Sequence, residues 1–253
     1  MFQIENVSKT YNGKAKSKKG NADIVKAVDS LSLTVNNGEI FGFLGPNGAG
    51  KTTSIRMITG ILQADEGDIK LDGISIKERP IAAKRTFAFV PDNPETFSRL
   101  KAIEYLNFIC DVYKIPAEDR AKKISELCEK FGLKEVLKNK ISSFSHGMKQ
   151  KLFLIAGLIT DPQNWILDEP MVGLDPEAAF IVKEMMRERA KAGKTVFFST
   201  HVMEVAEKLC DRIGIIKKGK LVFVGTMDEL KTQHGQNGES LEDIFINLVK
   251  AGE

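Results

Sequence analysis

The sequence has few cysteines, no long apolar run and no recognisable export signal, and each shortage excludes a class of protein. Its three cysteines, Cys110, Cys128 and Cys210, lie far apart, which supports neither a disulfide framework nor the spacing of a metal site. No stretch approaches the ~18 consecutive apolar residues of a membrane-spanning helix, and the opening MFQIENVSKTY lacks the basic-then-apolar pattern of a secretory signal. We therefore expect a protein of the reducing cytoplasm that neither spans a membrane nor is exported.

Positive charges only slightly outnumber negative ones, which argues against nucleic acid as a partner. The net charge is only +3 over 253 residues. Lys14, Lys16, Lys18 and Lys19 do cluster, but Gly and Asn flank them, and a solvated hairpin loop is the simpler interpretation. With 42% hydrophobic and 28% charged residues the composition is ordinary for a globular protein, and the length suits one large α/β domain or two modest ones.

The first third of the chain combines β-type runs with turn residues. Strands are expected at 2–7, 24–28, 31–35, 40–44, 67–71, 74–76 and 86–90. The first three suggest an antiparallel layer, because short runs alternate there with turns such as Asn36-Asn37-Gly38. A helix is expected from about Thr53 to Thr59, where Gly60 ends it.

Helical spacing replaces this pattern from about 91 to 159. Apolar residues recur there at intervals of three and four, which predicts a helical insert within an α/β frame. Strands of parallel-sheet type return at 165–167, 195–199 and 212–216, and a turn leads into a further run at 221–224. Near the end, Ser240 and Asp243 have the spacing of a capping box that opens a last helix.

Residues 45–52, Gly-Pro-Asn-Gly-Ala-Gly-Lys-Thr, match the phosphate-binding pattern G-x-x-x-x-G-K-[ST] between an apolar strand and a helix. The glycines let backbone N–H groups converge on phosphates, Lys51 adds a positive charge, and the Thr52 hydroxyl can ligate Mg²⁺. A Gly-rich turn could match this pattern by chance. The strand before it and the helix after it, which the phosphate-binding motif requires, favour the phosphate-binding interpretation. The sequence therefore predicts a nucleoside triphosphate held by Gly45, Pro46, Asn47, Gly48, Ala49, Gly50, Lys51, Thr52 and Thr53.

Two acids and a histidine follow later apolar strands. Asp168 and Glu169 end the run at 165–167, where Asp168 can hold Mg²⁺ and Glu169 can polarise an attacking water. Alone, such a pair is more often a strand exit into solvent, but the phosphate loop upstream favours the catalytic interpretation. His201 follows the strand at 195–199, at the sheet edge where ligands of open α/β folds bind, so we expect it to contact the γ-phosphate.

Together these motifs resemble the ATP-binding subunit of an ATP-binding-cassette (ABC) transporter over nearly the whole chain. Tyr11 stands where that family stacks an aromatic ring on adenine, and Asp175 ends a D-loop that begins at Gly173. The signature position of the family is occupied by Ser145, His146, Gly147 and Met148. In this family the signature loop of one copy closes on ATP held by the phosphate loop of another, and the dipole of the helix after Ser145 suits a γ-phosphate.

The resemblance implies a fold, partners and a location. The fold is an α/β phosphate-loop NTPase (RecA-like) core with an antiparallel β subdomain (1–90 and 160–225), an inserted helical subdomain (91–159) and a C-terminal helical extension (226–253). All form a single nucleotide-binding domain over 1–253. The function implied is an ATPase with ATP and Mg²⁺, paired with a second copy or a paralogue. It would drive an integral-membrane transporter subunit from the cytoplasmic face of the membrane, with no nucleic acid as a partner.

Two positions depart from the family pattern. The signature reads Phe144-Ser145-His146-Gly147-Met148 where the family usually has Leu-Ser-Gly-Gly-Gln, so one glycine and the glutamine are replaced. After the strand at 86–90, Asp92 stands where a glutamine is expected. Its carboxylate could approach Mg²⁺, although a simple turn residue in Pro-Asp-Asn-Pro remains an alternative. These departures resemble the branch that serves drug and peptide exporters.

Two other interpretations compete with a transport ATPase. A soluble ABC-type ATPase acting on DNA or ribosomes would be expected to show two cassettes in one chain or a long heptad insertion, and neither is present. A phosphate-loop kinase or GTPase would leave the signature residues and His201 unexplained, and no Asn-Lys-x-Asp guanine motif occurs.

Overall fold

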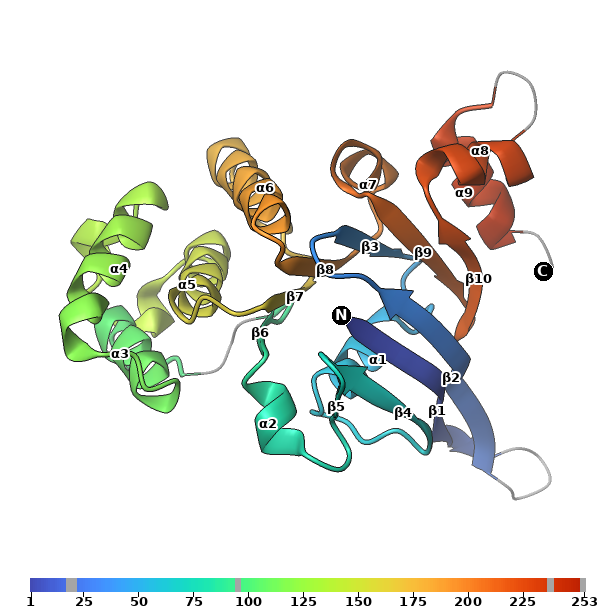
Figure 1. The fold of residues 1–253 in the computed structure, drawn as a ribbon, viewed down its shortest axis with the longest axis horizontal. Coiled ribbons are helices and arrows are strands. Elements are labelled where there is room, and N and C mark those ends of the chain that lie inside the picture. Colours follow the sequence, from blue (N-terminus) through green and yellow to red (C-terminus); the bar gives the residue numbers. More distant parts are fainter. Residues whose placement is uncertain (17–21, 94–96, 236–238, 251–253) are drawn as a thin grey trace.

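The computed structural model describes residues 1–16, 22–93, 97–235 and 239–250. Within these ranges the chain forms two β-sheets, a group of helices beside the larger sheet and a helical C-terminal end (Figure 1). No helix in these ranges is both long enough and apolar enough to cross a membrane.

The larger sheet positions the candidate site, because its parallel strands end at one edge. Its strand order is β10-β9-β3-β8-β7-β6, in which only β10 pairs antiparallel. The strands are β3 (Ile40–Leu44), β6 (Phe87–Val90), β7 (Asn164–Asp168), β8 (Thr195–Thr200), β9 (Arg212–Lys217) and β10 (Lys220–Gly225). The central strands are nearly continuous apolar runs buried on both faces, as is typical of parallel sheets. Since β8 lies between β3 and β7, residues that follow these three strands are neighbours.

The smaller sheet confirms the antiparallel layer expected near the start of the chain. It contains β1 (Phe2–Lys16), β2 (Ala22–Val35), β4 (Glu66–Leu71) and β5 (Ile74–Ser75) in the order β2-β1-β4-β5. The expectation of two strands at 24–28 and 31–35 was wrong. They form the single strand β2, in which Ser30 takes a φ of +52° and the register with β1 shifts, so an irregularity replaces the turn. Of the lysine cluster, Lys18 and Lys19 lie outside the described residues.

A cluster of aromatic rings joins the two sheets. The Phe197 ring lies 5.8 Å from Phe41, 5.6 Å from Phe43 and 5.7 Å from Phe2, and all four side chains are fully buried. Aromatic pairs of this kind contribute about 0.5–1.5 kcal/mol each beyond the burial of their area. The cluster therefore fixes the smaller sheet against β3, the strand that leads into the phosphate loop.

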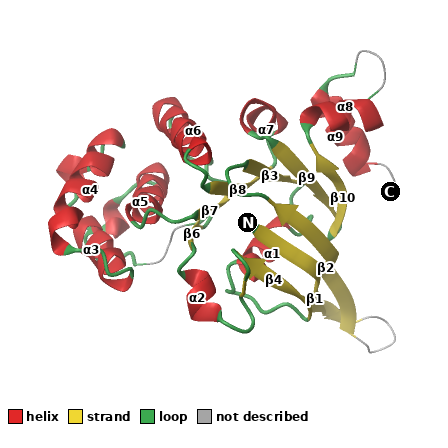
Figure 2. Cartoon of the chain, in the orientation of Figure 1, coloured by secondary structure: helices red, strands yellow, loops and turns green. Residues whose placement is uncertain are grey.

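Helices cover both faces of the larger sheet (Figure 2). Helix α1 (Lys51–Ile58) lies on the side of the smaller sheet, whereas α6 (Pro176–Lys191) and α7 (Met203–Leu209) pack on the opposite face. Helix α1 begins close to the position expected from the sequence. Helix α2 (Pro80–Lys84) was not predicted, because five residues are too few to show helical periodicity.

The segment 91–159, expected to form a helical insert, contains a group of helices beside β6 and β7 that begins at Ala102. It contains α3 (Ala102–Val112), α4 (Ala117–Lys130) and α5 (His146–Ile159), with 3-10 turns at Lys134–Val136 and Ile141–Ser143. The buried residues of these helices form one cluster with those of β6 and β7, so the group is continuous with the sheet. Cys110 and Cys128 are buried in α3 and α4, and all three cysteines are free thiols.

Two helices end the described chain. Helix α8 (Met227–His234) packs against α9 (Leu241–Lys250), which also contacts α7. The capping box predicted at Ser240 is confirmed: the Asp243 N–H donates to Ser240 Oγ at 3.1 Å, and the Ser240 N–H donates to Asp243 Oδ2 at 3.3 Å.

Candidate nucleotide site

The phosphate loop lies between β3 and α1, where the backbone allows only glycine at two positions. Gly50 has a φ of +111°, and a Cβ there would lie 2.6 Å from the Ala27 carbonyl oxygen. A Cβ at Gly45 would lie 2.4 Å from the carbonyl oxygen of Ile216. Both contacts are with backbone that cannot move aside, so the loop keeps its curvature only with these glycines.

Lys51 is the first residue of α1, and its side chain turns back over the loop. Its Nζ donates to the Gly45 carbonyl oxygen at 2.6 Å and lies 3.5 Å from Glu169 Oε1. Lys51 is buried, with 6% of its surface exposed. A buried ammonium beside the loop provides the positive charge that a triphosphate requires.

A cavity of about 230 Å³ opens beside this loop. It is lined by Ala27, Pro46, Asn47, Gly48, Gly50, Lys51, Thr52, Thr53, Asp92 and Glu169. Most of the residues expected to hold nucleotide therefore meet around one space, together with two acids from later strands.

Asp168 is the last residue of β7 and is buried next to the loop. The Ser199 hydroxyl donates to Asp168 Oδ1 at 2.5 Å, and the Thr52 hydroxyl also hydrogen-bonds this carboxyl. Burial raises the pKa of Asp168, while the hydrogen bonds from Ser199 and Thr52 act in the opposite direction. Thr52 and Asp168, two of the three expected metal ligands, are thus in direct contact.

Glu169 is held in an unusual backbone conformation that aims its carboxylate at the loop. Its φ is +48°, a left-handed value that costs about 1 kcal/mol or more for a residue with a side chain. The Glu169 N–H donates to Ser199 Oγ at 2.9 Å. Both carboxylate oxygens lie 3.0 Å from His201 Nδ1, and a proton on this nitrogen makes it the donor of the contact.

Asp92 follows β6 and reaches the same cavity. Its negative charge is close enough to contribute to the raised pKa of Asp168. Asp92 is exposed and lies at a bend, so the structure agrees both with a ligand beside the cavity and with a turn residue.

Tyr11 is not among the residues that line the cavity. It lies on β1 opposite Val25, and 41% of its surface is exposed. The neighbouring strand β2 instead contributes Ala27 to the lining. The sequence analysis missed Ala27, since an alanine carries no chemical signal.

The signature residues lie away from this cavity, at the start of α5. Ser145 is the N-cap, and its Oγ accepts from the Met148 N–H at 3.3 Å. His146 is exposed, and no residue of 145–148 lines the cavity. Within one chain the structure therefore does not bring the signature loop to the phosphate loop. Asp175 is also placed apart from the cavity, as the N-cap of α6.

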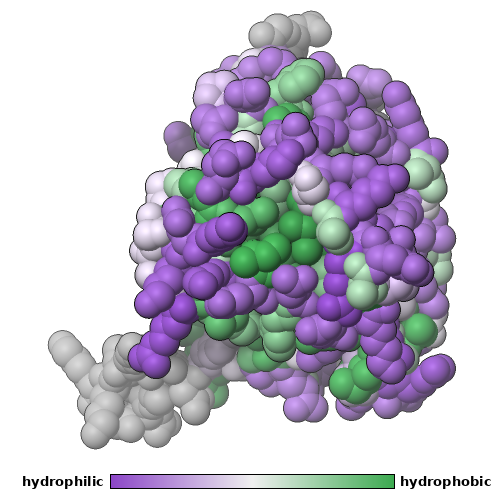
Figure 3. All heavy atoms as spheres, turned by 90° about the vertical axis from the view of Figure 1, so that its left-hand side faces the viewer, coloured by the Kyte–Doolittle hydropathy of each residue, from purple (hydrophilic) through white to green (hydrophobic). Residues whose placement is uncertain are grey.

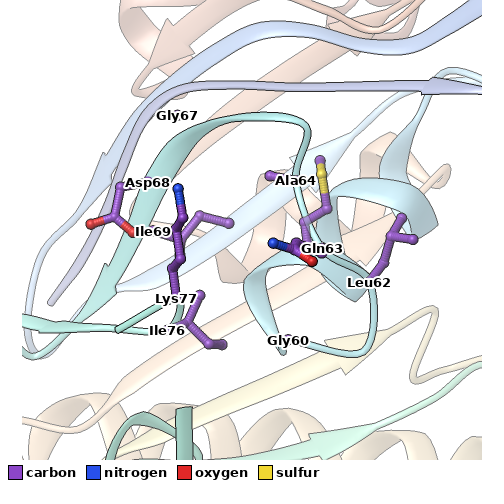
Figure 4. A pocket seen from close by; sticks show the side chains of 10 residues that line it. Gly60, Leu62, Gln63, Ala64, Gly67, Asp68, Ile69, Ile76 and Lys77 are labelled. Atoms are coloured by element: carbon purple, nitrogen blue, oxygen red, sulfur yellow. The ribbon is translucent and has the colours of Figure 1, made fainter. Parts of the chain in front are cut away.

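A second cavity of about 240 Å³ lies at the other end of α1 (Figure 4). It is lined mainly by the segment that follows α1 and by β4, including Gly60, Leu62, Gln63, Asp68, Ile69 and Lys77. None of its lining residues belongs to the phosphate loop or to the acids after β6 and β7, so it is separate from the candidate site.

Ser199 is the functional residue that sequence reasoning missed most clearly. It sits fully buried on β8 and bonds both Asp168 and Glu169, which lie on or next to β7. The sequence offers only a partial indication of this role. Ser199 is a polar residue near the end of an apolar strand, two positions before His201, which places it at the sheet edge where ligands bind.

The comparisons with known proteins agree with this geometry. The family model described as ABC transporter matches residues 28–172. The linearmycin resistance ATP-binding protein LnrL of Bacillus subtilis is 38% identical over all of this chain and 76% of its own length. The ABC transporter ATP-binding protein NatA of Bacillus subtilis is 32% identical over 100% of this chain and 99% of its own length.

Solved structures show the same fold. A structure titled as the ATP-binding subunit of an ABC transporter has a TM-score of 0.87 at 29% identity, covering 99% of this chain and all of its own. The dimeric cassette MJ0796 bound to ADP and Pi, at 24% identity and a TM-score of 0.79, covers 89% of this chain and 98% of its own and supports the fold alone. The chain thus belongs to the ABC transporter family as an ATP-binding protein, and it is an ATPase with the α/β phosphate-loop fold.

Proposed function

We propose that the chain hydrolyses Mg²⁺-bound ATP as one half of a head-to-tail dimer that drives a separate integral-membrane subunit, in the direction of export. The observation that carries the proposal is the meeting of Lys51, Glu169 and His201 beside the phosphate loop. These groups follow three neighbouring strands, β3, β7 and β8, at one sheet edge, and they supply a cation, a base and a residue that orients the base.

Hydrolysis follows from this arrangement. Glu169 is the base: its carboxylate takes a proton from the attacking water as the new bond to the γ-phosphorus forms, and the electron pair of the broken bond leaves with ADP. His201 Nδ1–H holds the carboxylate in place. Contact of the other ring nitrogen with the γ-phosphate requires a proton on that nitrogen as well, because phosphate oxygens only accept. Lys51 offsets the charge on the phosphate oxygens.

The donor set around the loop fits Mg²⁺. The hydroxyl of Thr52 and the carboxylates of Asp168 and Asp92 are hard oxygen ligands. The described residues contain no group of three or more His, Cys, Asp or Glu side chains that could hold a metal by themselves. That agrees with Mg²⁺, which binds through one or two carboxylates together with phosphates and water rather than in a protein cage. When bound, the ion neutralises charge on the phosphates.

The dimer is supported by the position of the signature loop. Ser145, His146 and Gly147 lie outside the cavity of their own chain, at the N-terminus of α5, where backbone N–H groups and the helix dipole favour an anion. A second copy that places this loop over the phosphate loop would complete two ATP sites at one interface.

The contact with the membrane subunit is proposed at the start of the helical insert. Phe97 and Arg99 are exposed there, and the Phe97 ring lies 5.7 Å from Phe108 and 5.2 Å from Tyr105. Tyr105 in turn stacks on Phe153 of α5 at 5.0 Å. The helical end of the molecule also carries an apolar patch surrounded by hydrophilic side chains (Figure 3). A force applied at Phe97 would thus reach α5, and hence the signature loop, through packed rings.

Export and a location on the cytoplasmic face of the membrane are part of the same proposal. The name of the relative LnrL refers to resistance to linearmycin, which suggests removal of a compound from the cell. The proposal extends that direction to this chain.

The test is the variant Glu169→Gln, which keeps the shape of the side chain but not its basicity. We expect steady-state ATP hydrolysis to fall by about a hundredfold or more, because a general base contributes on that order. ATP affinity, measured by equilibrium binding, should stay within about twofold of the original protein, because the amide makes no worse a contact with bound nucleotide. Near-normal hydrolysis by this variant would remove Glu169 from the mechanism.

A further inference from the structure

The signature loop and the D-loop pack closely against each other at two glycines. A Cβ at Gly147 would lie 2.5 Å from the Gly173 carbonyl oxygen, and a Cβ at Gly173 would lie 2.3 Å from Cδ2 of His146. Two glycines therefore permit a contact that any larger residue would push apart. The start of α5 and the segment before α6 are packed as one surface.

An ion pair fastens the same two segments one helical turn further along. Lys151 lies four residues after Gly147 on α5, and its Nζ is 2.6 Å from Asp175 Oδ2. The Lys151 side chain is mostly buried, with 18% exposed. The other oxygen of Asp175 accepts from the Ala178 N–H at 2.8 Å and so caps α6. One carboxylate thus holds α5 through a side chain and α6 through a backbone N–H.

The segment that Asp175 anchors begins at Glu169. The Val172 N–H donates to the Glu169 carbonyl oxygen at 3.2 Å, and the Leu174 N–H donates to the Met171 carbonyl oxygen at 3.3 Å. These two turns brace the backbone between Glu169 and Asp175. A displacement of Asp175 is therefore passed to the backbone that sets the direction of the Glu169 carboxylate.

We propose that Lys151 is a positioning residue for ATP hydrolysis, acting through Asp175 to make the signature helix and the Glu169 segment move as one body. The inference rests on the proposed dimer, in which α5 closes on the partner's ATP. When α5 is drawn toward that ATP, the ion pair carries the motion to Asp175 and aligns Glu169 in the same chain. Lys151 itself touches neither the phosphate loop nor the cavity beside it.

Lys151→Met removes the charge while keeping a long apolar side chain. We expect kcat to fall by about tenfold, which is less than the hundredfold attributed to a misplacement of about 1 Å. KM for ATP should change by less than about twofold, because the phosphate loop is intact. Lys151→Arg, which can still reach the carboxylate as a cation, should restore at least half of the original kcat.

Asp175→Asn tests the partner without removing the helix cap, because asparagine caps helices as well as aspartate does. If the two residues act through each other, Lys151→Met combined with Asp175→Asn should have nearly the kcat of Lys151→Met alone. Losses that multiply in the double variant would show two independent effects and would overturn the proposal.

A matched control shows whether the effect of Lys151→Met is specific to this ion pair or follows from the loss of any ion pair. Lys208 Nζ lies 2.6 Å from Glu204 Oε1 on the exposed surface of α7, the same distance as in the proposed pair. Lys208→Met should leave kcat within about twofold of the original, as expected for an exposed pair of little energetic weight. Hydrogen exchange at 170–175 should become faster in Lys151→Met and stay unchanged in Lys208→Met.

Measuring Glu169→Gln together with Lys151→Met separates a failure of the positioning role of Lys151 from a failure of the proposed function. An unchanged kcat in Lys151→Met, with Glu169→Gln inactive, overturns only the positioning role. Hydrolysis by Glu169→Gln overturns the proposed function. If Lys151→Met loses ATP binding and turnover equally, or loses turnover only in proportion to the unfolded fraction seen by circular dichroism, Lys151 is structural and the inference is wrong.

Discussion

Ser199→Ala should damage both stability and catalysis, because one hydroxyl serves two neighbours. The hydroxyl donates to Asp168 Oδ1 at 2.5 Å and accepts from the Glu169 N–H at 2.9 Å, in a side chain with no exposed surface. Alanine leaves a carboxylate oxygen and an N–H without this partner. Each buried group left unpaired costs about 1–3 kcal/mol, so for two groups we expect a loss of about 2–6 kcal/mol in the free energy of unfolding.

The catalytic loss has a separate cause. Without the bond to Ser199, the left-handed backbone of Glu169 loses one of the contacts that hold it. We expect kcat to fall about tenfold, less than for removal of the base itself. Urea unfolding and steady-state hydrolysis at saturating ATP measure the two effects.

Thr195→Val is the matched control on the same strand. Thr195 is also fully buried, and its hydroxyl donates to the Asn36 carbonyl oxygen at 3.2 Å, at the opposite end of β8. It should cost about 1–3 kcal/mol in stability and leave kcat unchanged. If Ser199→Ala behaves like Thr195→Val, with lower stability but full kcat, our account of how Glu169 is positioned is refuted.

Three further variants test the remaining site assignments. Tyr11→Ala should weaken ATP and GTP binding together by about 1–3 kcal/mol if the ring stacks on the base, and unchanged dissociation constants for both would leave Tyr11 a surface residue. Asp92→Asn should raise the half-saturating Mg²⁺ concentration for hydrolysis several-fold, about 1 kcal/mol for a weakened contact with a charged group, whereas a superimposable titration would make Asp92 a turn residue. Phe97→Ala should uncouple transport from hydrolysis while the purified chain keeps its ATPase activity, and loss of that activity with assembly intact would contradict the docking role.

The parts of the fold that depend on local sequence could be predicted from it. The phosphate loop is a continuous segment whose residue pattern can be recognised by itself, although the carbonyl groups that exclude larger residues at Gly45 and Gly50 belong to Ile216 and Ala27. The capping box at Ser240 is complete within four residues. Strands of the parallel sheet are buried on both faces, so they are continuous apolar runs. Such runs can be recognised in the sequence without knowing which strands pair with them.

Features that depend on distant residues could not be predicted in the same way. The irregularity at Ser30 depends on the pairing of β2 with β1, and the sequence there shows only a break between two apolar runs. Ser199 and Asp168 are 31 residues apart and become partners only because β7 and β8 are neighbours. Lys151 and Asp175 form an ion pair because α5 packs against the D-loop. The sequence pattern around Lys151 and Asp175 does not predict that these two segments touch.

The central claim, that two chains share each ATP, is tested most directly by the mass of Glu169→Gln in solution. Light scattering with and without ATP, at the same protein concentration, compares the two states. Because ATP would contact the phosphate loop of one copy and the signature loop of the other, it should shift this variant from monomer to dimer. Ser145→Ala together with Glu169→Gln should require a higher ATP concentration for the same shift. An equal mass with and without ATP, at concentrations where ATP binding is shown to be saturated, would contradict the shared site.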